Sequence, residues 1–396
     1  MTAQASQRLN ALDNLRSLLA LLGIPYHVEF FLFNSAMLSE GVRRFWSGRS
    51  LSVTLHQHHA MYFFLMNYIH VFRMPAFFLL AGFFAHSLYE KKSALHLLKN
   101  RLVRVGLPFC FYFACVIPLC WLRVWMYARQ HHQPFYAVLA EYYHNGILWA
   151  DINNLSNYWF LYYLLIFYCA ALFFILLRKI QVIPEKWIAV FDRVVEQLLS
   201  TRMIYGVMFL VGYVIFAKMH YWYTMLDESL TPSWGLLLFY TCWFFLGWYS
   251  WRHRIVFQVF KQFAWQQLLL SMAFYGVYLI FYFHFSDEQY ALGYFTALVF
   301  YFLTMVLSVF GCIGFVWRYL PKEEGLLQKT LRYFSGASYW FYLTQIVICA
   351  FFVSVMQSVT THFYAQFLGA TALSFVVCIG SYHLVVRRTR LSNIVG

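Results

Sequence analysis

The sequence has little charge. Asp, Glu, Lys and Arg make up 11% of its 396 residues and hydrophobic residues 62%, whereas an ordinary soluble domain is about 25% charged. Ten apolar stretches are each long enough to cross about 30 Å of hydrocarbon, and over such lengths helices satisfy their own backbone hydrogen bonds in lipid. We therefore predict an all-α, polytopic protein of the lipid bilayer, with spans near residues 15–36, 61–86, 103–127, 158–177, 203–220, 234–251, 264–284, 291–317, 333–357 and 364–386.

Other features are lacking as well. There is no internal repeat and no long polar stretch that could fold as a soluble domain, so we predict a single transmembrane domain over residues 1–396. The first apolar run is too long for a cleavable signal peptide and is expected to be a retained span. The eight cysteines all fall in predicted spans without a C-x-x-C pair, which argues against a disulfide framework and a zinc site. The histidines of the two predicted outer loops are scattered and predict no metal site either: His56, His58, His59, His131, His132 and His144.

The net charge of +14 does not point to nucleic acid, because the positive residues are unevenly distributed. If the N-terminus lies inside, 22 of the 29 lysines and arginines fall in inner loops and ends of the predicted spans. Such an asymmetry is the positive-inside signal of membrane topology. It predicts that both termini are cytoplasmic.

Charge is nevertheless present at membrane depth in the first span. Arg16 and His27 are eleven residues apart, so on a continuous helix they share a face and lie about 16 Å apart along the axis. Arg16 would then lie at the membrane edge and His27 near the midplane. An ionisable side chain at that depth is a functional-site hypothesis by default.

The second span carries His70 and Arg73, three residues apart and therefore on one helix face. Pro25 and Pro75 each free a backbone carbonyl near the same depth. Together these features predict a polar cavity between the first two spans. The alternative is a hydrogen-bonded staple between two helices.

Arginines also mark the inner edge of the third span. Arg101 and Arg104 share a face, and their planar forks suit bidentate binding of phosphate. The alternative is that they only reflect the positive-inside rule. Asp13, one turn before Arg16, is predicted to cap the first span or to pair with that arginine.

These residues resemble the membrane-bound acyltransferase type 3 family. The resemblance covers most of the chain, in the family's order, and two positions depart from it: Gln345 stands where the family often has His, and Asn157 where its glucan-succinylating group has His. The matching stretches are Asp13-Asn-Leu-Arg16, Gly23-Ile-Pro-Tyr-His27, Ile69-His-x-Phe-Arg-Met74, Phe77-Phe78, Gly82-x-Phe84, Arg101-x-x-Arg-Val-Gly-x-Pro108, Trp159-Phe-Leu161 and Ser338-Tyr-x-x-Tyr-Leu343.

The resemblance implies an acyl-CoA-dependent O-acyltransferase of a bacterial inner membrane. Its donor would be cytoplasmic succinyl-CoA or acetyl-CoA, and its acceptor a hydroxyl of an external glycan such as a periplasmic glucan; no bound cofactor is expected. His27 would be the general base, assisted by Arg16, Arg73 and His70. Arg101 and Arg104 would bind acyl-CoA, and the further candidates are Asp13, Trp159, Tyr342 and Gln345.

Two other classes remain open from the residues. A transporter or flippase for an acidic or lipid-linked solute would use Arg73 and the histidines as substrate or proton-coupling groups. Many transporters have inverted repeats or interrupted helices in both halves, whereas here the prolines and internal charges crowd into the first two spans. A structural assembly subunit would explain the spans but not these charges.

Overall fold

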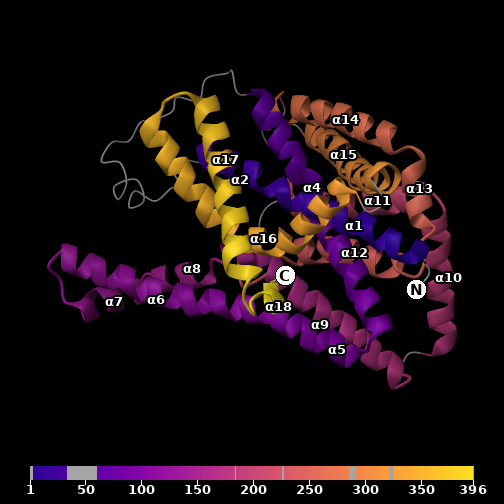
Figure 1. Cartoon of the computed structure of the whole chain (residues 1–396), viewed down its shortest axis with the longest axis horizontal. Helices are drawn as coiled ribbons and strands as arrows, with labels where there is room; N and C mark the ends of the chain where they lie inside the picture. Colours follow the sequence, from indigo (N-terminus) through magenta and orange to yellow (C-terminus); the bar gives the residue numbers. More distant parts are fainter. Residues whose placement is uncertain are drawn as a thin grey trace.

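The computed structural model describes residues 3–33, 60–182, 184–224, 227–284, 291–320 and 325–395. In these ranges the regular elements are helices, and the β-structure is one isolated bridge between Asn154 and Ser229. Eight of the described helical segments are long and apolar enough to cross a membrane, and a ninth forms if the bent pair of helices α10 (Glu185–Ser200) and α11 (Met203–Met219) is counted as one span. The predicted all-α, multi-pass membrane protein is confirmed (Figure 1).

In the described residues all ten predicted segments fall on helices, although the first is divided between two, and α11 (Met203–Met219) and α12 (Trp234–Ser250) have only 17 residues each. The long elements are α1 (Ala3–Leu21), α2 (Gly23–Phe33), α4 (Ala60–Lys91), α6 (Leu107–Gln130), α9 (Trp159–Lys179), α10 (Glu185–Ser200), α11 (Met203–Met219), α12 (Trp234–Ser250), α14 (Ala264–His284), α15 (Ala291–Tyr319), α16 (Leu326–Val359) and α17 (Phe363–Ser381). The short ones are α5 (Ala94–Arg101), η3 (Leu102–Gly106), α7 (Phe135–His144), α8 (Ile147–Asn153), η4 (Ser156–Tyr158), α13 (Val256–Gln262), η5 (Tyr382–Val386) and α18 (Ser392–Val395).

The first span is two helices rather than the continuous one expected. α1 ends at Leu21 and α2 begins at Gly23, with a turn at Leu22 whose N–H donates to the carbonyl of Leu18 at 3.0 Å. Pro25 lies in the first turn of α2, where its missing N–H removes no helical bond. The two helices together form one candidate span, Ala11–Leu32, with Arg16 on α1 and His27 on α2.

α4 and α12 pack with their backbones in direct contact at the centre of the described bundle. A Cβ on Gly82 would lie 1.9 Å from the carbonyl oxygen of Phe244, and one on Gly247 would lie 1.8 Å from that of Leu79. Only glycine permits so close an approach. Because α4 is held in this way, the side chains on its opposite face have a fixed position next to α1, α2 and α16.

Candidate functional site

A cavity of about 260 Å³ lies between α1, α4, the junction of α5 with η3, α9 and α16. Its wall on α16 runs from Ser335 to Gln345, ten residues that rise about 15 Å along a helix. Arg16, Arg101 and Arg104 line the cavity together with Ser335, and Arg73 lines it together with Gln345. The structure therefore brings all four predicted site arginines to one cavity, although they come from three separate parts of the chain.

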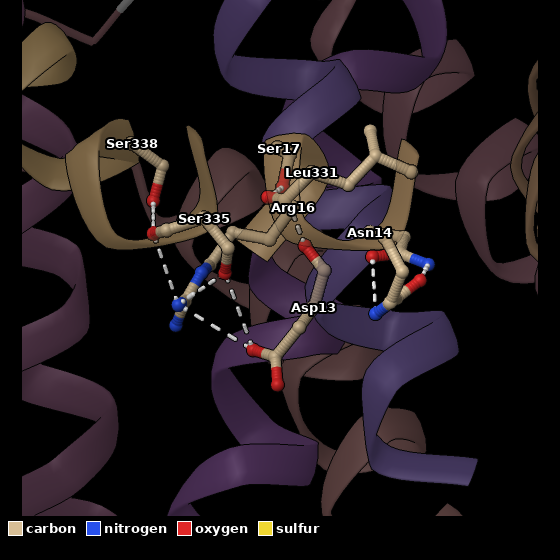
Figure 2. Close-up of polar contacts among 8 residues, drawn as sticks. Asp13, Asn14, Arg16, Ser17, Leu331, Ser335 and Ser338 are labelled. Carbon is tan, nitrogen blue, oxygen red and sulfur yellow. Dashed lines mark hydrogen bonds and ion pairs between the residues drawn. The ribbon is translucent and has the colours of Figure 1, made fainter. Parts of the chain in front are cut away.

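Arg16 is fixed in place by α16 (Figure 2). Its Nη2 donates to the Ser335 hydroxyl at 2.7 Å and to the Ser335 carbonyl at 3.1 Å, and it lies 3.4 Å from the Asp13 carboxylate. Asp13 lies in the middle of α1, which begins at Ala3. Of the two roles predicted for Asp13, capping is therefore wrong and pairing with Arg16 is confirmed.

Two further contacts hold α1 against α16 on the same side (Figure 2). The amides of Asn14 and Gln328 bond to each other at 2.9 and 3.3 Å, and Ser17 donates to the carbonyl of Leu331 at 2.8 Å. All three polar side chains are buried. These hydrogen bonds fix the position of α1, and with it Arg16, against α16.

Arg101 and Arg104 lie where α5 passes into the π-helical turn η3. The Arg101 guanidinium lies 4.9 Å from the ring centroid of Tyr168, and its Nε is buried without a hydrogen-bond partner. Arg16, Arg101 and Arg104 are close enough to repel one another. Among the described residues, the one carboxylate paired with this trio is Asp13. This end of the cavity is thus a positively charged site suited to an anion.

Arg73 and Gln345 meet against Gly23, the first residue of α2. The position of a Cβ on Gly23 would lie 2.6 Å from Gln345 Oε1 and 3.2 Å from Arg73 Nη1. Arg73 Nε, Arg73 Nη1 and Gln345 Oε1 are buried without a hydrogen-bond partner in the described structure. Buried polar groups are normally satisfied. Unpaired donors of a guanidinium inside a membrane cavity therefore indicate a place for a bound ligand.

Tyr26 links the two residues predicted on the second span. Its ring stacks on His70 with centroids 5.0 Å apart, and the Arg73 guanidinium lies 4.8 Å from its centroid. His27 lies within electrostatic range of both His70 and Arg73, and is 6% exposed with Nε2 unpartnered. His27 does not line the cavity that holds the arginines. Arg73 thus has the cavity on one side and the histidines on the other.

The remaining predicted positions divide between the cavity and the core. Tyr342 lines the cavity and Asn157 donates to its carbonyl at 2.8 Å. Trp159 is absent from the cavity wall and packs in an aromatic cluster with Phe78 and Tyr240. The loop histidines at 56, 58 and 59 lie outside the described residues, and among the described ones no group of three potential metal ligands is present.

Several residues of the site were not predicted from the sequence. Ser335 and Tyr168, which hold Arg16 and Arg101, and Tyr339, whose buried hydroxyl is unpartnered, all line the cavity. No local pattern marks them, because serine and tyrosine are common in membrane helices. Tyr26 had a signal, since it directly precedes His27, but its place between His70 and Arg73 follows only from the packing of α2 on α4.

Comparison with known proteins identifies the family to which the chain is similar. The profile of a family described as an acyltransferase domain matches residues 9–384, nearly the whole chain. The protein named glucans biosynthesis protein C in Salmonella typhi and in Salmonella typhimurium is 28% identical over 170 residues, which are 42% of this chain. The match covers only 38% of the length of those relatives. No solved structure matches.

Proposed function

The chain belongs to the type 3 acyltransferase family, and from that premise we propose that it transfers an acyl group from acyl-CoA to a hydroxyl of a glycan on the other side of a bacterial inner membrane. Acetyl and succinyl are the acyl groups proposed, and a periplasmic glucan is the proposed acceptor. The relatives' name refers to glucan biosynthesis, which supports this choice of acceptor.

The cavity is the observation that carries the proposal. The positively charged end of the cavity is formed by Arg16, Arg101 and Arg104, whose guanidinium forks suit the phosphates of CoA. About 15 Å further along α16 it reaches Arg73 and Gln345. A donor held by its phosphates at the first end would place the thioester of its extended arm near the second.

His27 would act as the general base from the opposite side of Arg73. Its buried, unpartnered Nε2 would take the proton of the acceptor hydroxyl while that oxygen attacks the thioester carbonyl. Arg73 would stabilise the oxyanion of the tetrahedral intermediate with the donors that now lack partners. Collapse would break the carbon–sulfur bond, and the departing thiolate would receive the proton from His27. An acyl-histidine route would use the same residues.

His70 and Gln345 would position these groups. His70 supports the Tyr26 ring on which Arg73 rests, so that the guanidinium keeps its orientation without an anionic partner. The Gln345 amide offers Nε2 as a second donor to an oxyanion beside Arg73. Because an amide cannot exchange protons at neutral pH, the proton transfer would rest on His27 alone.

Transfer of radiolabel from acetyl-CoA and from succinyl-CoA to periplasmic glycans, in membranes that hold the protein, would test the proposal. Wild type should label the glycan with one of the two donors, His27→Ala should give no label, and His362→Ala, a change of an exposed histidine between α16 and α17, should label like wild type. Equal expression and equal thermal unfolding of the three proteins would exclude misfolding. Full activity of His27→Ala would overturn the assigned base. If wild type gives no label with these or other acyl-CoAs, the transfer reaction itself is wrong.

A further inference from the structure

A second cavity, of about 640 Å³, lies on the other side of α4 and takes no part in the proposed reaction. It is lined by α4, α9, α10 and α12, near the C-terminal ends of α4, α9 and α12. Its walls are mostly aromatic and aliphatic, with Phe174, Phe245 and Trp248 among them. The volume is within the range of roughly 300–1,000 Å³ typical of sites for small molecules.

Helix α10 forms the outer wall of this cavity and is the most amphipathic of the long described helices. It is bent by 103° from α11 and runs along the edge of the molecule (Figure 1). Trp187 and Phe191 line the cavity yet remain 62% and 50% exposed. A helix with this pattern lies in the membrane interface, with its apolar face toward the acyl chains. The cavity is therefore open to the lipid of one leaflet, the inner one by the charge distribution of the sequence.

Charged groups of both signs lie at the cavity. Arg178 makes no hydrogen bond or ion pair with a described residue, and Arg252 bonds to Glu90 through Nε at 2.8 Å, which leaves its terminal nitrogens unused in the described structure. Asp192 of α10 also lines the cavity and, like both arginines, lies within electrostatic range of Tyr249. Two arginines, Asp192 and Glu90 sum to no net charge.

We propose that this cavity binds a zwitterionic phospholipid of the phosphatidylethanolamine type. Its phosphate would bond to Arg178 and Arg252, its ammonium group to Asp192, and one acyl chain would lie among the aromatic side chains between α9, α10 and α12. A phospholipid with a net negative head group would leave Asp192 facing an anion. The balanced charges therefore favour the zwitterionic lipid over an anionic one.

Native mass spectrometry of the purified, delipidated full-length protein, titrated with phosphatidylethanolamine or phosphatidylglycerol of identical chains, would test the site. Wild type should bind the first phosphatidylethanolamine at least tenfold more tightly than phosphatidylglycerol. Arg178→Gln should weaken that binding about tenfold, and Asp192→Asn should abolish the preference between the two lipids. Arg193→Gln, on the polar face of the same helix, is the matched control and should bind like wild type.

Two results would overturn the proposal. Equal binding of both lipids by wild type would mean that the site does not distinguish head groups by their charge. A loss of binding in Arg193→Gln equal to that in Arg178→Gln would mean that lipid binds through the general positive charge of the surface and not through this cavity. A cavity-filling change, Ile188→Trp, provides an independent measurement. It should prevent the first lipid from binding while thermal unfolding in detergent stays unchanged, and retained binding would place the lipid elsewhere.

Discussion

Asn157 and Tyr342 hydrogen-bond to each other's backbone. The Asn157 amide donates to the Tyr342 carbonyl at 2.8 Å, and the Tyr342 hydroxyl donates to the Asn157 carbonyl. Asn157 lies in η4, immediately before α9, and Tyr342 lies in α16. The pair thus connects two walls of the arginine-lined cavity. Asn157 stands where the glucan-succinylating group of the family has histidine.

Asn157→Ala should destabilise the protein more than it impairs chemistry. The Tyr342 carbonyl would lose the bond from Asn157 and keep the helical bond inside α16, and the loss of one such hydrogen bond costs about 0.5–1.5 kcal/mol of the free energy of unfolding. Denaturant unfolding in detergent should show this loss, while kcat stays within a few-fold of wild type because Asn157 does not line the cavity. Asn145→Ala, at the exposed end of α7, should change neither quantity. A large loss of kcat at unchanged stability would instead give Asn157 a chemical role.

Arg101→Ala should raise KM for acyl-CoA and leave kcat nearly unchanged. Each hydrogen bond to a charged group contributes about 1.5–3 kcal/mol, so the loss of one phosphate contact corresponds to about 10- to 100-fold in KM. Phosphate contacts bind ground state and transition state alike, and their loss therefore leaves kcat unaffected. Steady-state kinetics with Lys99→Ala as control would measure this, since Lys99 is exposed on the same helix and does not line the cavity. An equal KM for both variants would mean that Arg101 does not bind acyl-CoA and only reflects the positive-inside distribution of charge.

Arg73→Met should lower kcat with little effect on stability, whereas Arg16→Met should lower the free energy of unfolding. Two nitrogens of Arg73, Nε and Nη1, are buried without a hydrogen-bond partner in the described structure, so replacing Arg73 removes a buried charge at little cost in stability. Its kcat should nevertheless fall about 100- to 1,000-fold, as for the loss of one oxyanion donor. Arg16 bonds to Ser335 and Asp13, so Arg16→Met should lower the free energy of unfolding. If Arg73→Met unfolded more readily than Arg16→Met, Arg73 would be a structural residue.

The helices and the mid-membrane charges could be predicted because one physical constraint decides each. The bilayer sets the length of an apolar helix, so the ten predicted segments fall on helices of the described structure, the first of them on two. The high cost of charge in lipid singled out Arg73 without any structural information, and the structure places Arg73 at the cavity.

The pairing of helices could not be predicted in this way. Ser335 is 319 residues from Arg16, and nothing in the sequence around either residue indicates their hydrogen bond. The turn at Leu22 was missed because Pro25 is compatible with a first turn and with a kink alike. Long-range packing decides these features, whereas the apolar patterns report only local structure and membrane depth.

Gly23→Ala should reduce kcat without unfolding the protein. Its methyl group would come within 2.6 Å of Gln345 Oε1 and 3.2 Å of Arg73 Nη1, so the two side chains would have to move apart. Displacement of groups that position the reacting atoms by about 1 Å can cost roughly 100-fold in rate. Gly206→Ala is the matched control, because a Cβ there meets nothing within 4 Å, and the change should be neutral or stabilise α11 by up to about 1 kcal/mol. Acyl transfer and thermal unfolding of the two variants would check this, and wild-type kcat in Gly23→Ala would show that the positions of Arg73 and Gln345 do not limit the reaction.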